Sequence, residues 1–316
     1  MALRSRTGLT ARRWTVGVVL VAAGWALAGC SAPHPSAGGK PSVVTSTNVW
    51  GDVAAQVGGD LVHVTAIIDD PAVDPHSFEP SAHVQLAMAK ADLVVVNGGG
   101  YDDFATTMLS TLDPRPPVID AVQVSGRTGT DVNEHVWYDL PTVQAVADAV
   151  AARLGRIDPA HATDYTANAA AFTGQVDALV RRVRTLAATV RGQGAAVTEP
   201  VPDYLLDALG LVNRTPPQLS SAIEDETDVP PAVMRQMLDL FTGHTVAVLV
   251  NNAQTTGPQT TQVRDAARAA GVPVVDVTET LPAGKTYVSW MSANIDALAT
   301  ALGAQVPTTS APGASP

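Results

Sequence analysis

The stretch that decides the fold is PAHATDYTANAAAFTGQVDALVRRVRTLAATVR, residues 159–191. After its first residue it contains no further proline and a single glycine, Gly174. Apolar side chains recur close to helical spacing at Phe172, Val176, Leu179, Val180, Val183, Leu186 and Val190. At about 1.5 Å per residue, a helix of this length runs about 45 Å and can span two lobes. We therefore expect one long, rigid helix in the middle of the chain.

Short β-branched runs alternate with helical stretches on both sides of this helix. On the N-terminal side, the expected strands are 43–47, 62–68, 93–97 and 118–119, with helices at 83–91 and 102–112. On the C-terminal side, the expected strands are 195–198, 211–215, 245–251 and 273–277, with helices at 202–209, 230–241, 259–270 and 287–302. Such alternation favours parallel sheets covered by helices. The predicted fold class is α/β, with two lobes, each a mostly parallel sheet flanked by helices, joined by one long backbone helix.

The N-terminus has the composition of an export signal. Four arginines precede an uncharged, largely apolar run at residues 14–29. The run ends Leu27-Ala28-Gly29-Cys30, which resembles a bacterial lipobox, where the signal is cut before a cysteine that is then acylated. An uncleaved membrane helix is the alternative. The position of the chain's single cysteine, Cys30, favours lipidation.

Composition divides the chain further. Residues 30–41 and 304–316 are rich in proline, serine, alanine and glycine, as tethers and disordered tails are. We expect six parts: 1–29 signal peptide, 30–41 tether, 42–156 N-terminal lobe, 157–192 linking helix, 193–303 C-terminal lobe and 304–316 disordered tail.

Charge excludes one class of partner. The chain has 316 residues, is 46% hydrophobic and carries a formal net charge of −11. The apolar fraction supports a folded body, and the negative charge repels nucleic acid. We expect no nucleic-acid partner and a monomer.

Two of the seven histidines lie in distinctive loops. His76 is part of DPHSFEP, residues 74–80, and His135 is part of NEHVWYD, residues 133–139. Asp139 is placed to cap a following helix that has Pro141 in its first turn. Taken singly, each histidine has a structural explanation, and neither spacing matches a local zinc signature.

Several segments together resemble a known family. They are VVTSTNVW (43–50), VGGD (57–60), DPHSFEP (74–80), ADLVVVNG (91–98), EHVWYD (134–139), TETLP (278–282), YVSWM (287–291) and NIDAL (294–298). In this order they resemble the zinc/manganese-type metal-binding lipoproteins of ABC importers (ZnuA/TroA-like, cluster A-I), over roughly residues 43–303. The resemblance implies an exported protein, lipid-anchored at the outer face of the cytoplasmic membrane, which captures a divalent metal for an ABC permease and its ATPase.

The resemblance also implies a ligand set. The family's two histidine ligands correspond to His76 and His135, its third ligand to Glu199, and its fourth, usually an aspartate, to Glu279. The remaining nitrogen of each histidine needs a hydrogen-bond acceptor. Local candidates are Asp74, Glu79 and Asp139.

The residue types support this set independently. Two imidazoles and two carboxylates suit one borderline divalent cation as cargo, Zn²⁺ or Mn²⁺, with Fe²⁺ also possible. Two carboxylates also neutralise a doubly charged ion. One alternative is a binding protein for a chelated metal or a vitamin. The other is a secreted metalloenzyme, but catalytic zinc sites usually have three protein ligands and a water, so we expect no enzyme.

Overall fold

The computed structural model describes residues 39–70, 73, 78–129 and 132–304. All of them belong to one compact unit, Pro35–Pro316. The expected signal peptide, Cys30, Asp74, His76 and the tail after Ala304 lie outside the described residues. Within the described ranges, we find no helix with the length and apolar character needed to cross a membrane.

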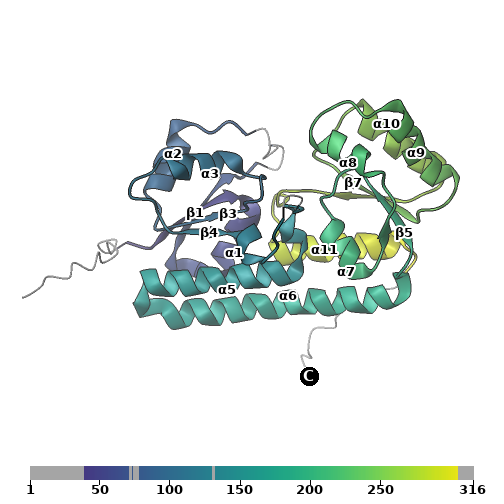
Figure 1. Ribbon diagram of the computed structural model, residues 1–316. Coiled ribbons are helices and arrows are strands. Elements are labelled where there is room, and N and C mark those ends of the chain that lie inside the picture. Colours follow the sequence, from purple (N-terminus) through teal and green to yellow (C-terminus); the bar gives the residue numbers. More distant parts are fainter. Residues whose placement is uncertain (1–38, 71–72, 74–77, 130–131, 305–316) are drawn as a thin grey trace, which may run out of the picture. The chain divides into compact units, whose positions relative to one another are not determined.

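The first sheet is parallel throughout and has the strand order β2-β1-β3-β4. Its strands are β1 (Ser42–Thr47), β2 (His63–Ile68), β3 (Leu93–Val96) and β4 (Val118–Asp120). Helices α1 (Asn48–Gly58), α2 (Ala82–Ala89), α3 (Asp103–Ser110) and α4 (Ala121–Val124) accompany them, with a 3₁₀ turn at Gly59–Leu61 (Figure 1). The central strand β3 is buried along its whole length, which explains its unbroken apolar run.

The second sheet repeats this arrangement, with the order β6-β5-β7-β8 and parallel pairing throughout. Its strands are β5 (Gly194–Val197), β6 (Val212–Asn213), β7 (Val248–Asn252) and β8 (Val274–Val277). Its helices are α7 (Asp203–Leu209), α8 (Pro217–Glu224), α9 (Pro231–Thr242), α10 (Pro258–Ala269) and α11 (Tyr287–Ala301). The chain leaves β5 toward β6 and returns to β7 on the other side, so the carboxyl ends of β5 and β7 form a topological switch point.

The long helix is α6, which covers 29 residues, Ala162–Val190. A 3₁₀ turn at Pro159–His161 delays its start by a few residues. It packs along α5 (Leu140–Ile157) and passes beneath both sheets (Figure 1). Its stripe of Phe172, Val176, Leu179, Val183 and Leu186 is buried in the largest core. The predicted α/β class with a long backbone helix is confirmed, whereas the exact lobe boundaries stay predictions.

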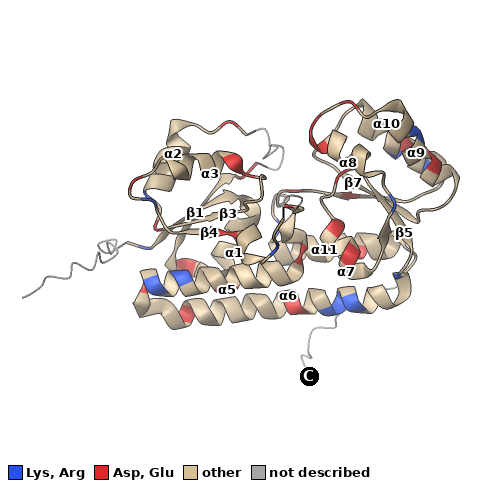
Figure 2. Cartoon of the chain, in the orientation of Figure 1, with Lys and Arg blue, Asp and Glu red and all other residues tan. Residues whose placement is uncertain are grey.

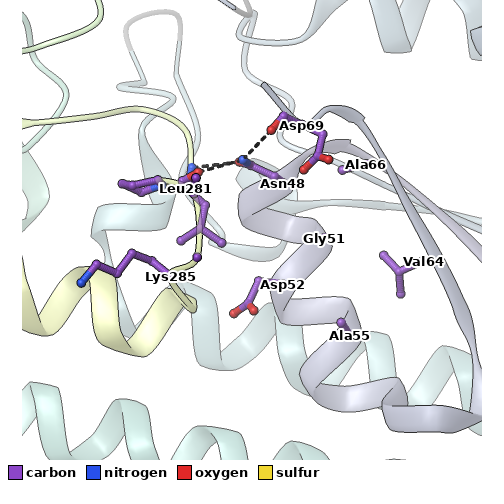
Figure 3. A pocket seen from close by; sticks show the side chains of 12 residues that line it. Asn48, Gly51, Asp52, Ala55, Val64, Ala66, Asp69, Leu281 and Lys285 are labelled. Atoms are coloured by element: carbon purple, nitrogen blue, oxygen red, sulfur yellow. Dashed lines mark hydrogen bonds between the residues drawn. The ribbon is translucent and has the colours of Figure 1, made fainter. Parts of the chain in front are cut away.

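Side-chain hydrogen bonds join the two halves of this unit. Asn48 in α1 bonds to Leu281 in the loop after β8, and Asp52 Oδ2 accepts from the Tyr287 backbone N–H at 2.8 Å. The Tyr138 hydroxyl donates to the carbonyl oxygen of Thr278 at 2.8 Å. A cavity of about 530 Å³ lies beside these contacts, between α1, β2 and the loop that follows Leu281 (Figure 3). The loop after β8 is therefore held by residues of the N-terminal half.

Candidate metal centre

Two predicted ligands follow strands of the second sheet. Glu199 comes two residues after β5, and Glu279 comes two residues after β8. Both are buried, with 3% and 5% of their surface exposed. Asn252, the last residue of β7, lies between them: its Nδ2 donates to Glu279 Oε1 at 2.6 Å and also to Glu199 Oε2. The switch point of the sheet thus brings these two carboxylates to one amide group.

The backbone at Glu279 is held by a second amide. Gln254 Oε1 accepts from the N–H of Glu279 at 2.6 Å and from that of Thr280 at 3.1 Å. Its Nε2 donates to Thr280 Oγ1 at 2.9 Å. Because Gln254 takes both backbone N–H groups, the peptide that carries Glu279 has one well-defined orientation.

His135 lies in the segment between α4 and α5, and it is only 1% exposed. Its ring contacts Trp137 edge-on, with 5.1 Å between the ring centroids. Asn133 Oδ1 accepts from its backbone N–H at 2.9 Å and lies 2.7 Å from its Nδ1. Because an amide oxygen only accepts, the hydrogen of the neutral ring belongs on Nδ1, and Nε2 then carries the lone pair. This is the arrangement that metal-binding histidines adopt.

Asn133 also connects the two halves of the site. Its Nδ2 donates to the carbonyl oxygen of Pro200 at 2.8 Å, and Pro200 directly follows Glu199. The hydroxyl of Tyr204 donates to the carbonyl oxygen of Asn133 at 2.6 Å. The segment that carries His135 is therefore tied to the turn that carries Glu199.

Another carboxylate lies near His135. Glu224, the last residue of α8, places Oε1 3.9 Å from His135 Nε2. Ligand atoms of Glu134, His135 and Glu224 all lie within 4.8 Å of one another. Burial, and after it the negative charges of Glu134, Glu199 and Glu279, together raise the pKa of Glu224 to about 8. The described part of the centre is thus an acidic cluster around one buried imidazole.

The other predicted residues have different surroundings. Glu79 is exposed. The carboxylate of Asp139 accepts from Arg127 at 3.1 Å and from the Thr142 hydroxyl at 2.5 Å. Helix α5 follows Asp139 with Pro141 in its first turn, as expected, but the predicted side-chain cap was wrong, because the carboxylate accepts no helix N–H. Asn133, rather than Asp139, is the described partner of His135 Nδ1.

The structure therefore brings Glu199 and Glu279 together at Asn252 and places Glu134 and Glu224 beside His135. Their assignment as metal ligands stays a prediction, as does that of His76. Sequence reasoning missed Asn133, Asn252, Gln254 and Glu224. One signal for Asn252 was present: two adjacent amides, Asn251-Asn252, end an apolar strand at the edge where α/β sheets bind ligands.

Comparison with known proteins places this geometry in context. The family model described as "ZnuA: Zinc-uptake complex component A periplasmic" matches residues 43–301, which agrees with the resemblance of the motifs. The manganese-binding lipoprotein MntA of Halalkalibacterium halodurans is 25% identical over 233 residues, 67% of this chain and 76% of that protein. The iron-binding protein YfeA of Yersinia pestis is 23% identical over 280 residues, 84% of this chain and 87% of that protein.

Solved structures share the fold. The periplasmic zinc-binding protein TroA from Treponema pallidum superposes with a TM-score of 0.72 at 22% identity, covering 84% of this chain and 100% of that chain. FpvC from Pseudomonas aeruginosa, in complex with Mn²⁺, gives a TM-score of 0.71 at 23% identity, covering 84% of this chain and 98% of that chain. At this identity the likeness establishes the architecture, and the ligands must be argued from the residues themselves.

Proposed function

Since the chain belongs to the ZnuA family of zinc-uptake complex components, we propose that it captures one divalent transition-metal ion outside the cytoplasm and delivers it to an ABC importer. The observation that carries the proposal is the contact of Asn252 with both Glu199 and Glu279. Two buried carboxylates repel each other and lose hydration, and binding a cation offsets this cost.

The proposed ligands come from both halves of the chain. His135 offers Nε2, because Asn133 occupies Nδ1. Glu199 and Glu279 offer carboxylate oxygens. His76 is proposed as the fourth ligand because it lies in the DPHSFEP motif that resembles the family's first histidine motif. Two imidazoles and two carboxylates form a neutral complex with a doubly charged ion, which suits Zn²⁺, Mn²⁺ or Fe²⁺.

The partners follow from the family. We propose that an ABC permease and its ATPase receive the ion, and that acylated Cys30 keeps the protein, as a monomer, at the outer face of the cytoplasmic membrane. Helix α6 packs along α5 and passes beneath both sheets. Such a continuous helix resists large hinge bending, so release uses small shifts of loops such as the one after β8.

We propose that the protein catalyses no reaction of its own. A catalytic zinc site keeps a coordination position open for water or substrate. Four protein ligands fill the positions of a tetrahedral ion, so the centre is suited to holding an ion and then releasing it unchanged.

Elemental analysis of the purified protein, followed by competitive titration with Zn²⁺ and Mn²⁺, tests the proposal. We expect one ion per chain. The His76→Ala, His135→Ala and Glu279→Ala variants should each lose more affinity than the roughly 10–100-fold that residues supporting a ligand contribute. His63→Ala is the matched control, because His63 is exposed on β2.

Two results would overturn the proposal. One is a protein that takes up no divalent ion. The other is a His135→Ala variant that binds metal as tightly as His63→Ala does. Native mass spectrometry separates the remaining alternative, since a bound chelate or vitamin adds several hundred daltons where a bare ion adds about 55–65.

A further inference from the structure

We infer that Glu224 is an additional metal ligand, which favours Mn²⁺ over Zn²⁺ at this centre. The inference rests on the proposed function, because it concerns the same ion. It goes beyond the four-residue set, since Glu224 lies at the end of α8, in a part of the chain to which no motif assigned a ligand.

The first argument is the distance between Glu224 and His135. Glu224 Oε1 lies 3.9 Å from Nε2 of His135, which is too long for a hydrogen bond. Bonds of about 2.0–2.2 Å to a shared ion place two ligand atoms roughly 3–4 Å apart. The separation therefore suits two ligands of one ion better than it suits a direct contact.

The second argument is the burial of the same oxygen and its lack of a hydrogen-bond donor among the described residues. Glu224 Oε1 is buried, and within the described ranges it accepts no hydrogen bond. A buried carboxylate oxygen without a donor carries a large desolvation cost. A cation between Glu224 and His135 would supply the missing interaction.

The third argument is the position of Glu224 in its helix. Leu219 and Ile223 of α8 are buried in the core of the second sheet, and they fix the end of the helix. A carboxylate at a helix C-terminus is unfavourable, because the helix dipole places negative charge there. Helix stability thus gives no reason for a glutamate at this residue, whereas a ligand role does.

Exposure places Glu224 on the solvent side of the centre. Its side chain is 23% exposed, whereas His135, Glu199 and Glu279 are 1%, 3% and 5% exposed. Asp225, Glu226 and Asp228 follow it in the chain. Figure 2 shows red, acidic segments next to α8. An incoming cation would therefore meet Glu224 before it reaches the buried ligands.

The consequence concerns the choice of metal. Protein-bound structural zinc is almost always four-coordinate, and imidazole nitrogen suits it well. Manganese prefers oxygen ligands and higher coordination numbers. A further carboxylate beyond the four proposed ligands raises the number of ligands and the proportion of oxygen atoms among them. It therefore increases the affinity for Mn²⁺ more than the affinity for Zn²⁺.

Affinities of Glu224→Gln and Glu224→Asp for Mn²⁺ and Zn²⁺ test the inference. Glu224→Asp keeps the charge but withdraws the carboxylate by one methylene, which separates ligation from charge attraction. We expect both variants to bind Mn²⁺ about 10-fold or more weakly, with a clearly smaller loss for Zn²⁺. Glu226→Gln, which removes an exposed charge two residues away, should match the wild type for both ions.

X-ray absorption of the Mn²⁺-loaded wild type and Glu224→Gln gives a second readout. We expect at least one fewer protein oxygen ligand in the variant. An unchanged ligand sphere, a Glu224→Asp variant equal to the wild type, or equal losses for both ions would overturn the inference. A wild type that binds neither ion overturns the proposed function itself, which is a different result from these.

Discussion

Asn48 Nδ2 donates to the carbonyl oxygen of Leu281, and Asn48 Oδ1 accepts from the N–H of the same residue, each at 2.9 Å (Figure 3). The two residues are 233 positions apart in the chain. Leu281 comes two residues after Glu279, so the first residue of α1 positions the loop that carries a proposed ligand. Through this loop, Asn48 acts on the C-terminal half of the proposed centre without being a ligand itself.

Replacing Asn48 with alanine should weaken metal binding through this loop. Both bonds to Leu281 are lost, which costs about 1–3 kcal/mol of stability. We expect about 10-fold weaker Zn²⁺ and Mn²⁺ binding, typical of residues that support a ligand. Asn168→Ala is the control, since it removes the bond from α6 to the carbonyl oxygen of Val57. Urea unfolding and metal titration should show lower stability in both variants but lower affinity in Asn48→Ala only.

Replacing Asn133 should act through the imidazole of His135. Asn133→Ala removes the acceptor for Nδ1 and frees the ring to rotate, so we expect metal affinity to fall about 10–100-fold. Asn133→Asp retains an acceptor and should recover most of the affinity, although it loses the bond to Pro200. Competitive titration compares the three proteins. Equal affinity in Asn133→Ala and the wild type would show that this contact does not orient a ligand.

Asn252 should keep the two buried carboxylates at ligating distance. In Asn252→Ala, the charges of Glu199 and Glu279 face each other without the shared amide, so the metal-free protein should lose about 1–3 kcal/mol of stability. Metal affinity should fall about 10-fold. The matched control is Asn251→Ala, because neighbouring Asn251 donates instead to Asp276 at 2.7 Å. Tighter metal binding in Asn252→Ala would mean that the amide competes with the ion.

Asp203 gives the metal-free protein a pH-dependent stability. Burial, with a smaller contribution from the charge of Asp207, raises its pKa from 3.8 to about 6. The folded state therefore binds the Asp203 proton more tightly than the unfolded state does. The contribution of this proton to the free energy of unfolding is fully present below pH 3.8, and it is lost as pH rises through about 6. Asp203→Asn should therefore gain about 1–3 kcal/mol at pH 7.5 and nothing at pH 3.5.

Urea unfolding at the two pH values, with metal removed by chelation, measures this effect. Asp164→Asn is the control, since Asp164 is an exposed acid in the first turn of α6. That variant should show no comparable gain at pH 7.5. An Asp203→Asn gain of the same size at both pH values would contradict the linkage.

The sequence predicted the architecture because the main helices and strands each have a clear apolar pattern within a short stretch of the chain. Helix α6 has one continuous apolar stripe, and β3 and β7 are short, fully buried runs. Strand β6 was predicted too long, since only Val212–Asn213 pair in the sheet. Beyond β6, the Thr215 hydroxyl accepts a hydrogen bond from the backbone N–H of Val197 at 2.7 Å, so a side chain takes the place of a backbone acceptor there.

The centre was less predictable because its contacts join distant residues. Asn252 reaches across 53 residues to Glu199 and 27 to Glu279, so no local pattern reveals it. Glu224 ends α8, a short helix for which the sequence pattern gave no prediction. His135 was recognisable from its motif, whereas its hydrogen bond to Asn133 depends on the shape of the loop.

A crystal structure of the metal-loaded protein, with anomalous diffraction at the absorption edge of the bound ion, tests the central claim most directly. With Zn²⁺ bound, we predict one anomalous peak about 2.0–2.2 Å from Nε2 of His135 and from carboxylate oxygens of Glu199 and Glu279. A peak bound by residues of one half of the chain alone, or one remote from His135, would contradict the account.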